Sequence, residues 1–309
     1  MARRGRNRRR GRPVDGVLLL DKPLGLSSNE ALQEVKGMLF AEKAGHTGSL
    51  DPLASGMLPL CFGEGTKFSR FLLDADKAYQ FTMKLGQRTE TGDAEGEVIE
   101  TRPVDVNEAQ LQQVVAEFRG PQDQVPSMYS AIKHEGQPLY KLARQGIEVE
   151  RQPRPINVYS LEILELNGDE ATLEARVSKG TYIRSLAEDI GEKLGCGAHV
   201  IMLRRLSVGG LDDATMVTMD QLKELREQEL GRDKVEALLQ PISTMVNHWP
   251  TLTLPDASAY YLRMGQPVVV PKAPTEGWVS LQLQDERFLG VGEVLDDGRV
   301  APRRLLTEA

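Results

Sequence analysis

The sequence contains little that would anchor a protein in a membrane or stabilise it outside the cell. Only Cys61 and Cys196 are cysteines in a chain of 309 residues, too few for the disulfide framework of a small secreted domain. The apolar run Val17 to Leu20 ends at Asp21, far short of a membrane span or a signal-peptide core. These absences predict a cytoplasmic protein that has no membrane partner.

Metal-binding patterns are missing as well. The sequence has no Cys-x-x-Cys pair and no His-x-x-x-His pair, and its 4 histidines are scattered. Aromatic residues make up only 5% of the chain, whereas 40% hydrophobic and 27% charged residues are ordinary for a soluble globular protein. A chain of 309 residues exceeds the roughly 250–300 at which one hydrophobic core stops growing. We therefore expect one large domain and one small domain.

Acidic residues are absent from residues 1–12, a segment that holds seven arginines. Because the net charge of the whole chain is −7, the remaining residues are strongly acidic in sum. A segment so rich in Arg and Gly buries no apolar surface, so we predict a disordered arm over residues 1–12. Its arginines suit RNA phosphates, and the alternative is a terminus that only adds solubility.

The spacing of apolar residues predicts both helices and strands. Strands are expected over residues 16–21, 78–86, 156–166 and 170–178, the last two joined by an Asn167-Gly168 turn. Helices are expected over residues 28–40, 107–119, 181–194 and 218–239, the first preceded by a Ser27–Glu30 capping box. From Trp249 the sequence changes to Pro, Gly and short β-rich runs such as 266–270 and 279–283. This change predicts a boundary near 248–251, followed by a small all-β module.

Residues 45–56, Gly-His-Thr-Gly-Ser-Leu-Asp-Pro-Leu-Ala-Ser-Gly, form the most informative stretch of the chain. Asp51 is the only Asp, Glu, Lys or Arg within residues 44–63. The glycines open backbone conformations closed to other residues, and Pro52 favours an extended Asp51 that presents its carboxylate. An uncharged loop that displays one carboxylate is typical of an active site. The residues alone leave open an Asx-turn, in which Asp51 only bonds its own backbone.

This loop, with Asp21-Lys-Pro-Leu-Gly-Leu-Ser-Ser28 and Ser178-Lys-Gly-Thr-Tyr-Ile-Arg184, resembles the bacterial tRNA pseudouridine-55 synthases of the TruB family. The resemblance extends from about residue 14 to Arg304. It implies an isomerase that converts one uridine in the T-arm loop of tRNA into pseudouridine, with no cofactor and no metal. The implied fold is α+β, a mixed and largely antiparallel sheet flanked by helices over residues 13–248. A small β-rich PUA-like RNA-binding domain would follow over residues 249–309.

The resemblance also implies roles for single residues. Asp51 would be the nucleophile, attacking either C1′ of the sugar or C6 of the base, a choice that the sequence leaves open. Arg184 would form an ion pair that keeps Asp51 charged, because a buried carboxylate otherwise tends to take up a proton. Tyr79 would stack on the uracil and is a candidate relay for the C5 proton. The implied substrate-binding residues are His46, Tyr79, Tyr182, Leu203 and Lys22, the last of them supporting the pocket rather than touching the uracil.

Each of these residues has a plainer interpretation when the resemblance is set aside. Arg184 would be a surface arginine on a helix, and His46 a structural hydrogen-bonding residue. Tyr79, Tyr182 and Leu203 would be ordinary core residues, as aromatic and aliphatic side chains at strand or helix spacing usually are.

Two other classes of function also remain open. Gly63-Glu-Gly-Thr-Lys67 suggests a nucleotide-binding loop, but the order Gly-Lys-Ser/Thr of a phosphate loop is absent. The basic arm fits a non-catalytic RNA-binding or tRNA-folding protein equally well, and that activity is compatible with catalysis. Nothing in the sequence requires more than a monomer. Outside the arm, the arginines expected to meet tRNA are Arg144, Arg151, Arg154, Arg204, Arg205, Arg303 and Arg304.

Overall fold

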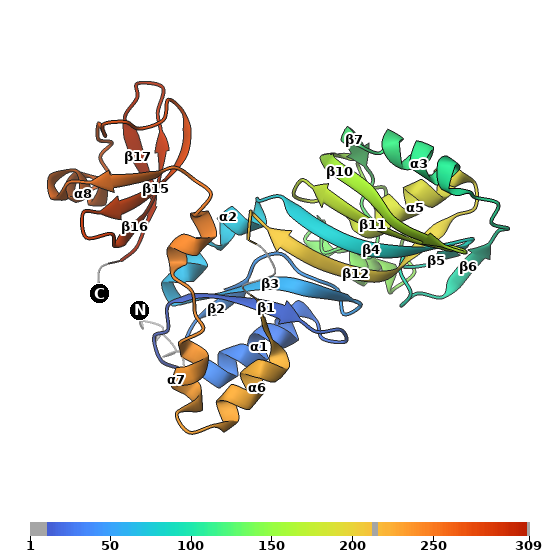
Figure 1. Ribbon diagram of the computed structural model, residues 1–309, viewed down its shortest axis with the longest axis horizontal. Helices are drawn as coiled ribbons and strands as arrows, with labels where there is room; N and C mark the ends of the chain where they lie inside the picture. Colours follow the sequence, from blue (N-terminus) through green and yellow to red (C-terminus); the bar gives the residue numbers. More distant parts are fainter. Residues whose placement is uncertain (1–10, 212–215, 308–309) are drawn as a thin grey trace, which may run out of the picture.

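The computed structural model describes residues 11–211 and 216–307, and a nine-stranded sheet forms its centre (Figure 1). In spatial order the strands are β13 (Val217–Thr218), β1 (Gly16–Lys22), β3 (Ala54–Phe62), β12 (Ala198–Val208), β4 (Lys77–Leu85), β11 (Glu170–Val177), β10 (Arg154–Asn167) and β7 (Gly120–Gln124), with β2 (Ala44–His46) paired to β3. Only β1–β13 and β3–β12 are parallel pairs among these strands. The predicted mixed, largely antiparallel sheet is confirmed.

Local sequence signals account for several of these elements. The alternating residues of β4 give a strictly alternating burial pattern, as a strand with one face on the core requires. The predicted β10–β11 hairpin is present, but its two turn residues are Gly168 and Asp169, one position later than expected, and Gly168 has a φ of 62°. The capping box before α1 (Ser28–Leu39) is present, because Ser27 and Glu30 bond each other's backbone N–H groups.

Helices pack on the sheet towards its two ends (Figure 1). Near β1 lie α1, α6 (Met219–Glu227) and α7 (Gly231–Glu236), and near β10 and β12 lie α3 (Glu108–Glu117) and α5 (Ile183–Leu194). The alternation of β1 divides the core, because Leu18 and Leu20 join the cluster under these helices while Val17 and Leu19 face the opposite cluster. None of the helices among the described residues is long and apolar enough to cross a membrane.

One predicted helix is wrong in extent. The expected helix over 218–239 is divided into α6 and α7, with Gln228 extended and Leu230 in the left-handed region at a φ of 56°. A Cβ on Gly231 would lie 2.2 Å from the carbonyl oxygen of Arg226, so the chain folds back closely on the end of α6. The helical periodicity continues across this break, which is why it predicted one helix.

The C-terminal region forms a separate four-stranded sheet at one end of the molecule (Figure 1). Its strands are β14 (Thr251–Leu254), β15 (Gly277–Leu283), β16 (Phe288–Val294) and β17 (Val300–Leu305). The prediction of an all-β module is wrong in one respect, because α8 (Asp256–Arg263) packs here through Ala259 and Leu262. The expected strand over 266–270 is reduced to a single bridge between Val268 and Val300.

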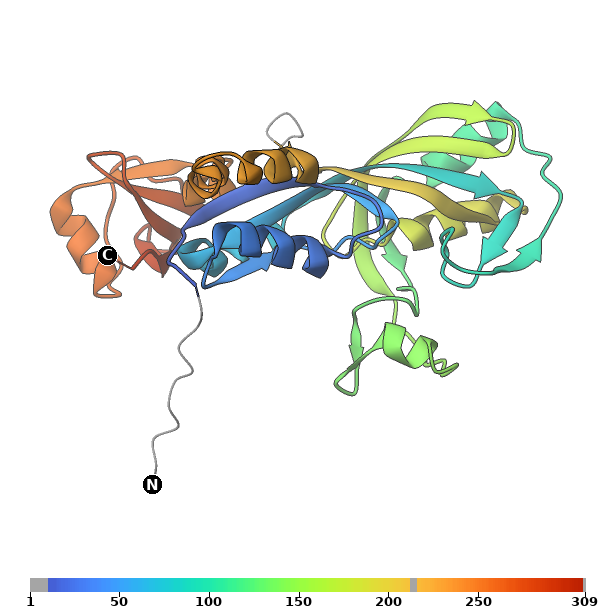
Figure 2. The same ribbon diagram turned by 90° about the horizontal axis from the view of Figure 1, so that it is seen from below.

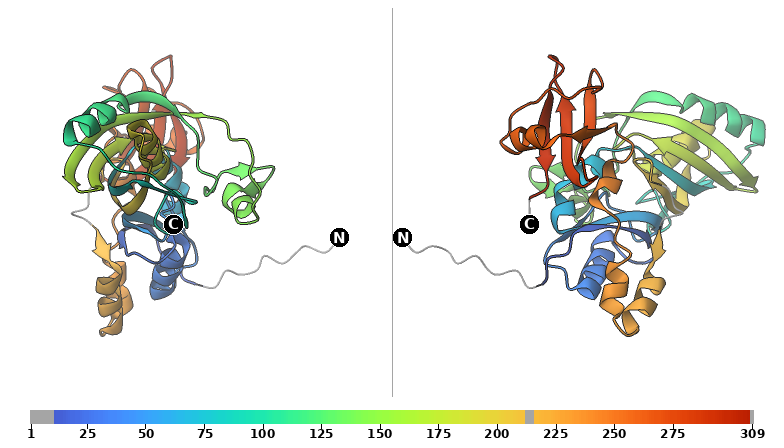
Figure 3. Two further views of the ribbon diagram at one scale, coloured as in Figure 1. Left: turned by 90° about the vertical axis from the view of Figure 1, so that its right-hand side faces the viewer. Right: turned by 60° about the vertical axis from the view of Figure 1, so that its left-hand side comes forward.

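The remaining helices and strands are short. They are the 3-10 turns η1 (Gly63–Lys67) and η3 (Ile242–Val246), the helices α2 (Ser69–Leu73) and α4 (Leu139–Ala143), and the strands β5 (Gln87–Thr89), β6 (Val98–Thr101), β8 (Lys133–His134) and β9 (Gln137–Pro138). The segment of β8, β9 and α4 projects away from the sheet (Figures 2 and 3). The predicted arm lies outside the described residues over 1–10, whereas Arg12 forms an ion pair of 2.7 Å with Glu236.

Aromatic residues join the C-terminal sheet to the rest of the chain. Phe71 of α2 packs against Trp249 and Trp278, with ring centroids 5.0 and 5.2 Å away. Phe68 packs against Phe288 of β16 at 5.5 Å. Edge and tilted contacts of this kind add to the apolar area that the rings bury. The C-terminal sheet therefore helps to hold α2 in place.

We expect Trp249→Ala to lower the free energy of unfolding by about 2 kcal/mol, roughly half the loss for a fully buried tryptophan, because Trp249 is half-buried. It loses its contact with Phe71 and its stacked contact with Trp278. Thermal or urea unfolding would measure the change. Tyr260→Ala, in the same region but 57% exposed, is the control and should change stability little. Equal losses in both variants would contradict the role of the aromatic contacts.

Candidate active site

A cavity of about 310 Å³ lies where the loop after β2 meets β4, β12 and the segment from β11 to α5. Five predicted site residues line it: Asp51, Tyr79, Tyr182, Arg184 and Leu203. Two predicted site residues, Lys22 and His46, are not among its lining residues. The cavity thus brings together residues that are far apart in the sequence. This arrangement argues against the alternative in which Asp51 belongs to an Asx-turn and only bonds its own backbone.

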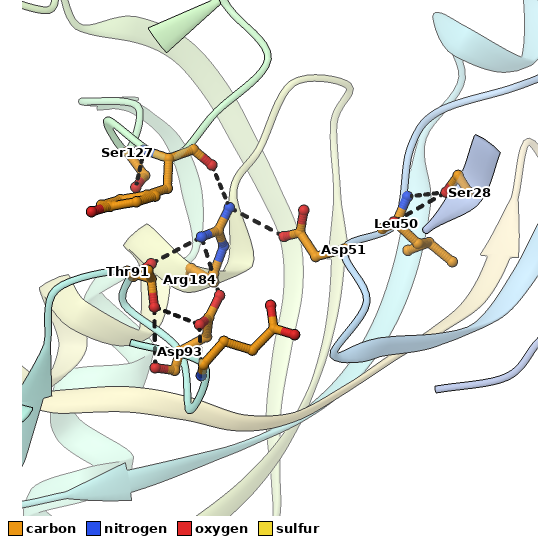
Figure 4. Close-up of polar contacts among 9 residues, drawn as sticks. Ser28, Leu50, Asp51, Thr91, Asp93, Ser127 and Arg184 are labelled. Atoms are coloured by element: carbon orange, nitrogen blue, oxygen red, sulfur yellow. Dashed lines mark hydrogen bonds and ion pairs between the residues drawn. The ribbon is translucent and has the colours of Figure 1, made fainter. Parts of the chain in front are cut away.

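Arg184 is buried in the wall of this cavity and is only 6% exposed. Its Nη2 lies 3.1 Å from Oδ2 of Asp51, and its Nη1 lies 3.1 Å from Oδ2 of Asp93 (Figure 4). The same two nitrogens donate hydrogen bonds to the carbonyl oxygens of Tyr129, at 2.8 Å, and Thr91, at 2.9 Å. Four acceptors fix the planar guanidinium. The alternative of a surface arginine is excluded by this burial.

Asp93 is the residue that sequence reasoning missed. Its side chain is 3% exposed, and its Oδ1 accepts hydrogen bonds from the Thr91 hydroxyl and from the backbone N–H of Glu95. A carboxylate this buried is costly unless it is paired, and Arg184 supplies the pairing. The available signal was the run Thr91-Gly-Asp-Ala-Glu-Gly96, an acid in a glycine-containing turn. Nothing in the sequence connects that turn with Arg184.

Asp51 differs from expectation in its burial. Its side chain is 45% exposed, while that of Arg184 is 7% exposed, so the guanidinium is the buried partner of the pair. The prediction of a buried carboxylate is therefore wrong, because the 47–51 loop carries Asp51 at the open side of the cavity. The 3.1 Å contact with Arg184 thus fixes the orientation of a carboxylate that is half-exposed to water.

Two buried side chains hold the loop that carries Asp51. Ser28, at the start of α1, accepts a hydrogen bond of 2.7 Å from the N–H of Leu50 and donates one of 3.1 Å to its carbonyl oxygen (Figure 4). Arg205 of β12 donates to the carbonyl oxygen of Gly48 at 3.1 Å. The residue before Asp51 is thus tied to α1, and the start of the loop is tied to the sheet.

One of the predicted RNA-contacting arginines does not face solvent as expected. Arg205 is 1% exposed and donates to the carbonyl oxygens of Met57 and Gly48, so its prediction as an RNA-contacting residue is wrong, because β12 pairs between β3 and β4 and this side chain is buried there. The side chain of Arg204 is 30% exposed and forms two bonds of 2.9 Å with the carboxylate of Asp21, so its contact with RNA stays a prediction. The exposed members of the predicted set are Arg144, Arg154, Arg303 and Arg304, with Arg151 partly exposed.

The predicted base-contacting residues form the apolar part of the cavity. Tyr79 is 8% exposed and Leu203 is 7% exposed, so both belong to the core and also reach the cavity. Gln124 holds the backbone of Tyr182, accepting from its N–H at 2.8 Å and donating to its carbonyl oxygen at 3.0 Å. Burial raises the pKa of the Tyr182 hydroxyl, which therefore stays protonated at neutral pH.

Lys22 and His46 lie outside the lining of the cavity. Lys22 is fully buried, and its ammonium group donates to the carbonyl oxygens of Pro23 and Leu26 at 2.8 and 2.6 Å. Burial lowers the pKa of Lys22 to about 8, against the opposing effect of the Asp51 charge. His46 lies in β2, where burial lowers its pKa, and its Nδ1 has no hydrogen-bond partner among the described residues. Lys22 thus holds the backbone at Pro23 and Leu26 and does not line the cavity itself.

The segment Gly63–Lys67 does not form a phosphate loop. It is the 3-10 turn η1, and the ammonium group of Lys67 contacts the carboxylate of Glu64 and the hydroxyl of Thr307. A phosphate-binding lysine needs its donors free for the ligand. Within residues 11–211 and 216–307, no group of three His, Cys, Asp or Glu side chains is placed to hold a metal ion.

Comparison with known structures shows the same fold in two solved complexes. The chain superimposes with a TM-score of 0.73 on a protein in "a Cbf5-Nop10-Gar1 Complex", at 29% identity over 95% of this chain and 84% of that chain. A structure of "H/ACA RNP bound to a substrate RNA containing 2'-deoxyuridine" gives a TM-score of 0.72, at 27% identity over 98% of this chain and 92% of that chain. Both likenesses extend over nearly the whole chain.

Comparison of sequences gives much closer relatives. Residues 36–183 match the model described as "TruB family pseudouridylate synthase (N terminal domain)", residues 184–247 match "tRNA pseudouridylate synthase B C-terminal domain", and residues 250–306 match "Pseudouridine synthase II TruB, C-terminal". The tRNA pseudouridine synthase B of Stutzerimonas stutzeri is 57% identical over 96% of each chain. That of Vibrio parahaemolyticus is 54% identical over 97% of each chain. The chain belongs to the TruB family of pseudouridylate synthases.

Proposed function

We propose that this protein isomerises uridine 55 in the T-arm loop of tRNA to pseudouridine, with Asp51 as the nucleophile. The observation that carries the proposal is the 3.1 Å contact between a half-exposed Asp51 and a buried Arg184 in one open cavity. Membership of the TruB family supports the reaction, and relatives named tRNA pseudouridine synthase B support the substrate.

The reaction can be carried out by a carboxylate without a cofactor. The N1–C1′ bond of uridine breaks, the base turns and a C5–C1′ bond forms, while C5 loses a proton and N1 gains one, so the product has the same atoms and charge as the substrate. No redox cofactor and no energy source is therefore required. A carboxylate oxygen attacks C1′ or C6 and is later displaced, since it is both a nucleophile and a leaving group. The cavity of about 310 Å³ falls at the lower end of the range for small-ligand sites.

The other lining residues receive roles from their positions. Arg184 orients Asp51 and is itself held by Asp93. The target uridine leaves its stack, and the rings of Tyr79 and Tyr182 cover the flipped base. Leu203 closes the apolar side of the cavity. His46 contacts the RNA beside the flipped base, and Lys22 supports the Asp51 loop from behind.

The RNA-binding surface is proposed to extend beyond the cavity. The arm over residues 1–12 supplies phosphate contacts without sequence preference, residues 13–248 carry the reaction, and residues 249–309 bind tRNA outside the T-arm loop. The active species is proposed to be a monomer, since nothing in the sequence requires a second copy of the chain. A tRNA substrate and two free, buried cysteines support a cytoplasmic location.

The proposed function is tested on a T-arm hairpin RNA in a buffer that contains EDTA. Nuclease digestion followed by chromatography of the nucleosides should show one pseudouridine per hairpin. A hairpin with cytidine at the target position is the control and should be unchanged. Binding of the uridine hairpin without pseudouridine formation would instead favour the non-catalytic RNA-binding function, and loss of activity in EDTA would contradict the metal-free proposal.

Variants of Tyr79 separate stacking from proton relay. Tyr79→Phe keeps the ring and removes the hydroxyl, whereas Tyr79→Leu removes the ring as well. If the hydroxyl relays the C5 proton, we expect Tyr79→Phe to lose about 100-fold in single-turnover rate with RNA affinity unchanged. If stacking is the main contribution, only Tyr79→Leu should be defective. Wild-type rates for both variants would refute any role of Tyr79 at the base.

A further inference from the structure

Two buried cations in the cavity wall have no direct role in the reaction proposed above, although Arg205 also holds the Asp51 loop. Lys77, the first residue of β4, is 8% exposed, and Arg205 of β12 is 1% exposed. Both line the cavity, and both approach the place that a Cβ on Gly48 of the Asp51 loop would take, Arg205 Nη1 at 3.3 Å and Lys77 Cε at 3.7 Å. In the part of the chain that the structure describes, neither has a carboxylate oxygen within 4.0 Å. Two positive charges therefore face the cavity without an ion-pair partner.

Lys77 is held by backbone oxygens alone. Its ammonium group donates to the carbonyl oxygens of Ala75 at 2.6 Å, Leu73 at 3.2 Å and Leu72 at 3.4 Å. Leu72 and Leu73 end α2, the helix that the aromatic contacts of Phe71 fix against the C-terminal sheet. All three ammonium protons thus have acceptors, and the charge has a fixed position.

The nearest carboxylates are bound to other groups. Asp74 forms an ion pair of 2.9 Å with Lys179, and Asp76 accepts a hydrogen bond of 3.2 Å from the Tyr159 hydroxyl. A buried cation costs free energy when no carboxylate compensates it, and an apolar residue would fill the same place without that cost. The charge of Lys77 is therefore expected to be compensated by an anion that appears in the cavity.

We infer that Lys77, with Arg205 beside it, stabilises the negative charge that develops on the uracil during the isomerisation. The inference rests on the proposed function. Lys77 and Tyr79 lie on the same face of β4, because residues i and i+2 of a strand share a face. The side chain of Lys77 thus lies on the same strand face as the ring that covers the base, in the part of the cavity formed by β4 and β12 rather than the part that contains Arg184.

The movement of charge during the reaction fits this placement. If Asp51 attacks C1′, a new O–C1′ bond forms, the N1–C1′ bond breaks, and its electron pair remains on N1, O2 and O4 of the uracil. If Asp51 attacks C6, a new O–C6 bond forms and the π electron pair of C5–C6 moves to C5 and O4. In both cases Asp51 loses its charge and the base gains one. A fixed cation at the base stabilises that state without reorganising at the moment of reaction.

A contact with an RNA phosphate is the alternative use of this charge. Lys77 is buried and its three protons are bound by carbonyl oxygens, so it has no donor left for a phosphate oxygen. A phosphate contact would also strengthen ground-state binding and its dependence on salt. The two uses therefore differ in what they change, rate or affinity.

The test uses Lys77→Gln, which offers N–H donors to the carbonyl oxygens but no charge, and Lys77→Arg, which keeps the charge. Single-turnover rates are measured at saturating T-arm hairpin, and RNA affinity is measured at two salt concentrations. We expect Lys77→Gln to lose about 100-fold in rate, with affinity unchanged within about threefold, and Lys77→Arg to recover most of the rate. Lys84→Gln is the matched control, because Lys84 lies on the same strand but pairs with Asp169 away from the cavity.

A second substrate distinguishes electrostatic help from simple misplacement of the site. A hairpin with 5-fluorouridine at the target carries a base that accepts negative charge more easily. Loss of the parent nucleoside, measured at pH 6.5, should be impaired at least tenfold less by Lys77→Gln than the reaction of the uridine hairpin. Equal impairment on both hairpins would overturn the inference, and so would a loss confined to RNA affinity or a wild-type rate in Lys77→Gln.

The pH dependence keeps the inference testable if Lys77→Gln does not fold. Burial, the charge of Arg205 and the charge of Lys179 lower the pKa of Lys77, and the carboxylates of Asp76 and Asp74 raise it. The result is a pKa of about 8. The wild-type rate should therefore fall as the pH rises above 8, and Lys77→Arg should keep its rate there because arginine stays charged. Identical pH profiles for the two proteins would overturn the inference. If the wild type makes no pseudouridine at any pH, the proposed function fails instead.

Discussion

Asp51→Asn is expected to reduce pseudouridine formation to less than about one hundredth of the wild-type rate, because an amide supplies no anionic nucleophile. RNA affinity should stay within a few-fold, since phosphate contacts dominate binding and the substitution leaves them intact. The measurement is single-turnover conversion of a T-arm hairpin at saturating enzyme. Residual activity above about a hundredth, a loss of less than about 2.7 kcal/mol in transition-state stabilisation, would argue against a covalent role.

Asp169→Asn provides a matched control for this variant. Asp169 is 47% exposed and pairs with Lys84 at 2.6 Å, so it resembles Asp51 in exposure and in having a cationic partner. It lies in the β10–β11 turn, away from the cavity. Neither substitution should change stability much, because Lys84 keeps its contact with Glu170 and Arg184 keeps its ion pair with Asp93, and only Asp51→Asn should affect the reaction.

Local patterns were sufficient where a residue's surroundings follow from its near neighbours in the chain. The alternation of Tyr79, Phe81 and Met83 fixed the exposed and buried faces of β4, and Asn167-Gly168 located the β10–β11 hairpin. The same patterns failed at 218–239, where the chain reverses tightly at Leu230 and Gly231 without interrupting the helical periodicity. The spacing of apolar residues does not indicate where two elements approach each other closely, as they do at this reversal.

The candidate site was predicted only in part, for the same reason. Family motifs located Asp51, Tyr79, Tyr182, Arg184 and Leu203, which the structure brings to one cavity. Asp93 and Ser28 were missed, because their contacts with Arg184 and Leu50 join segments that are distant in sequence. Arg205 was misassigned to the surface, since charge alone suggested exposure while strand pairing buried it.

Arg184→Lys is expected to lower the single-turnover rate by about 100- to 1000-fold, although it keeps the positive charge. The guanidinium uses two nitrogens to reach Asp51 and Asp93, and the same nitrogens donate to two carbonyl oxygens. A lysine has one nitrogen on a flexible stem, so it cannot hold both carboxylates in these positions. Asp51 would then sample orientations unsuited to attack, a loss that falls on rate rather than on RNA affinity.

The substitution should also destabilise the fold, by about 3 kcal/mol, because the side chain of Asp93 is 3% exposed and would lose part of its pairing. Arg204→Lys separates this cost from the loss of catalysis. Arg204 holds Asp21 with two bonds of 2.9 Å and does not line the cavity, so its replacement should lower stability while the rate stays near that of the wild type. The single-turnover rate of Asp93→Asn should fall between the rates of Arg184→Lys and Arg204→Lys, because this variant loses the ion pair on one side of Arg184 and keeps the contact between Arg184 and Asp51. If Arg184→Lys retains the wild-type rate at a temperature where it is folded, charge alone is what Asp51 needs, and the orienting role of the guanidinium is wrong.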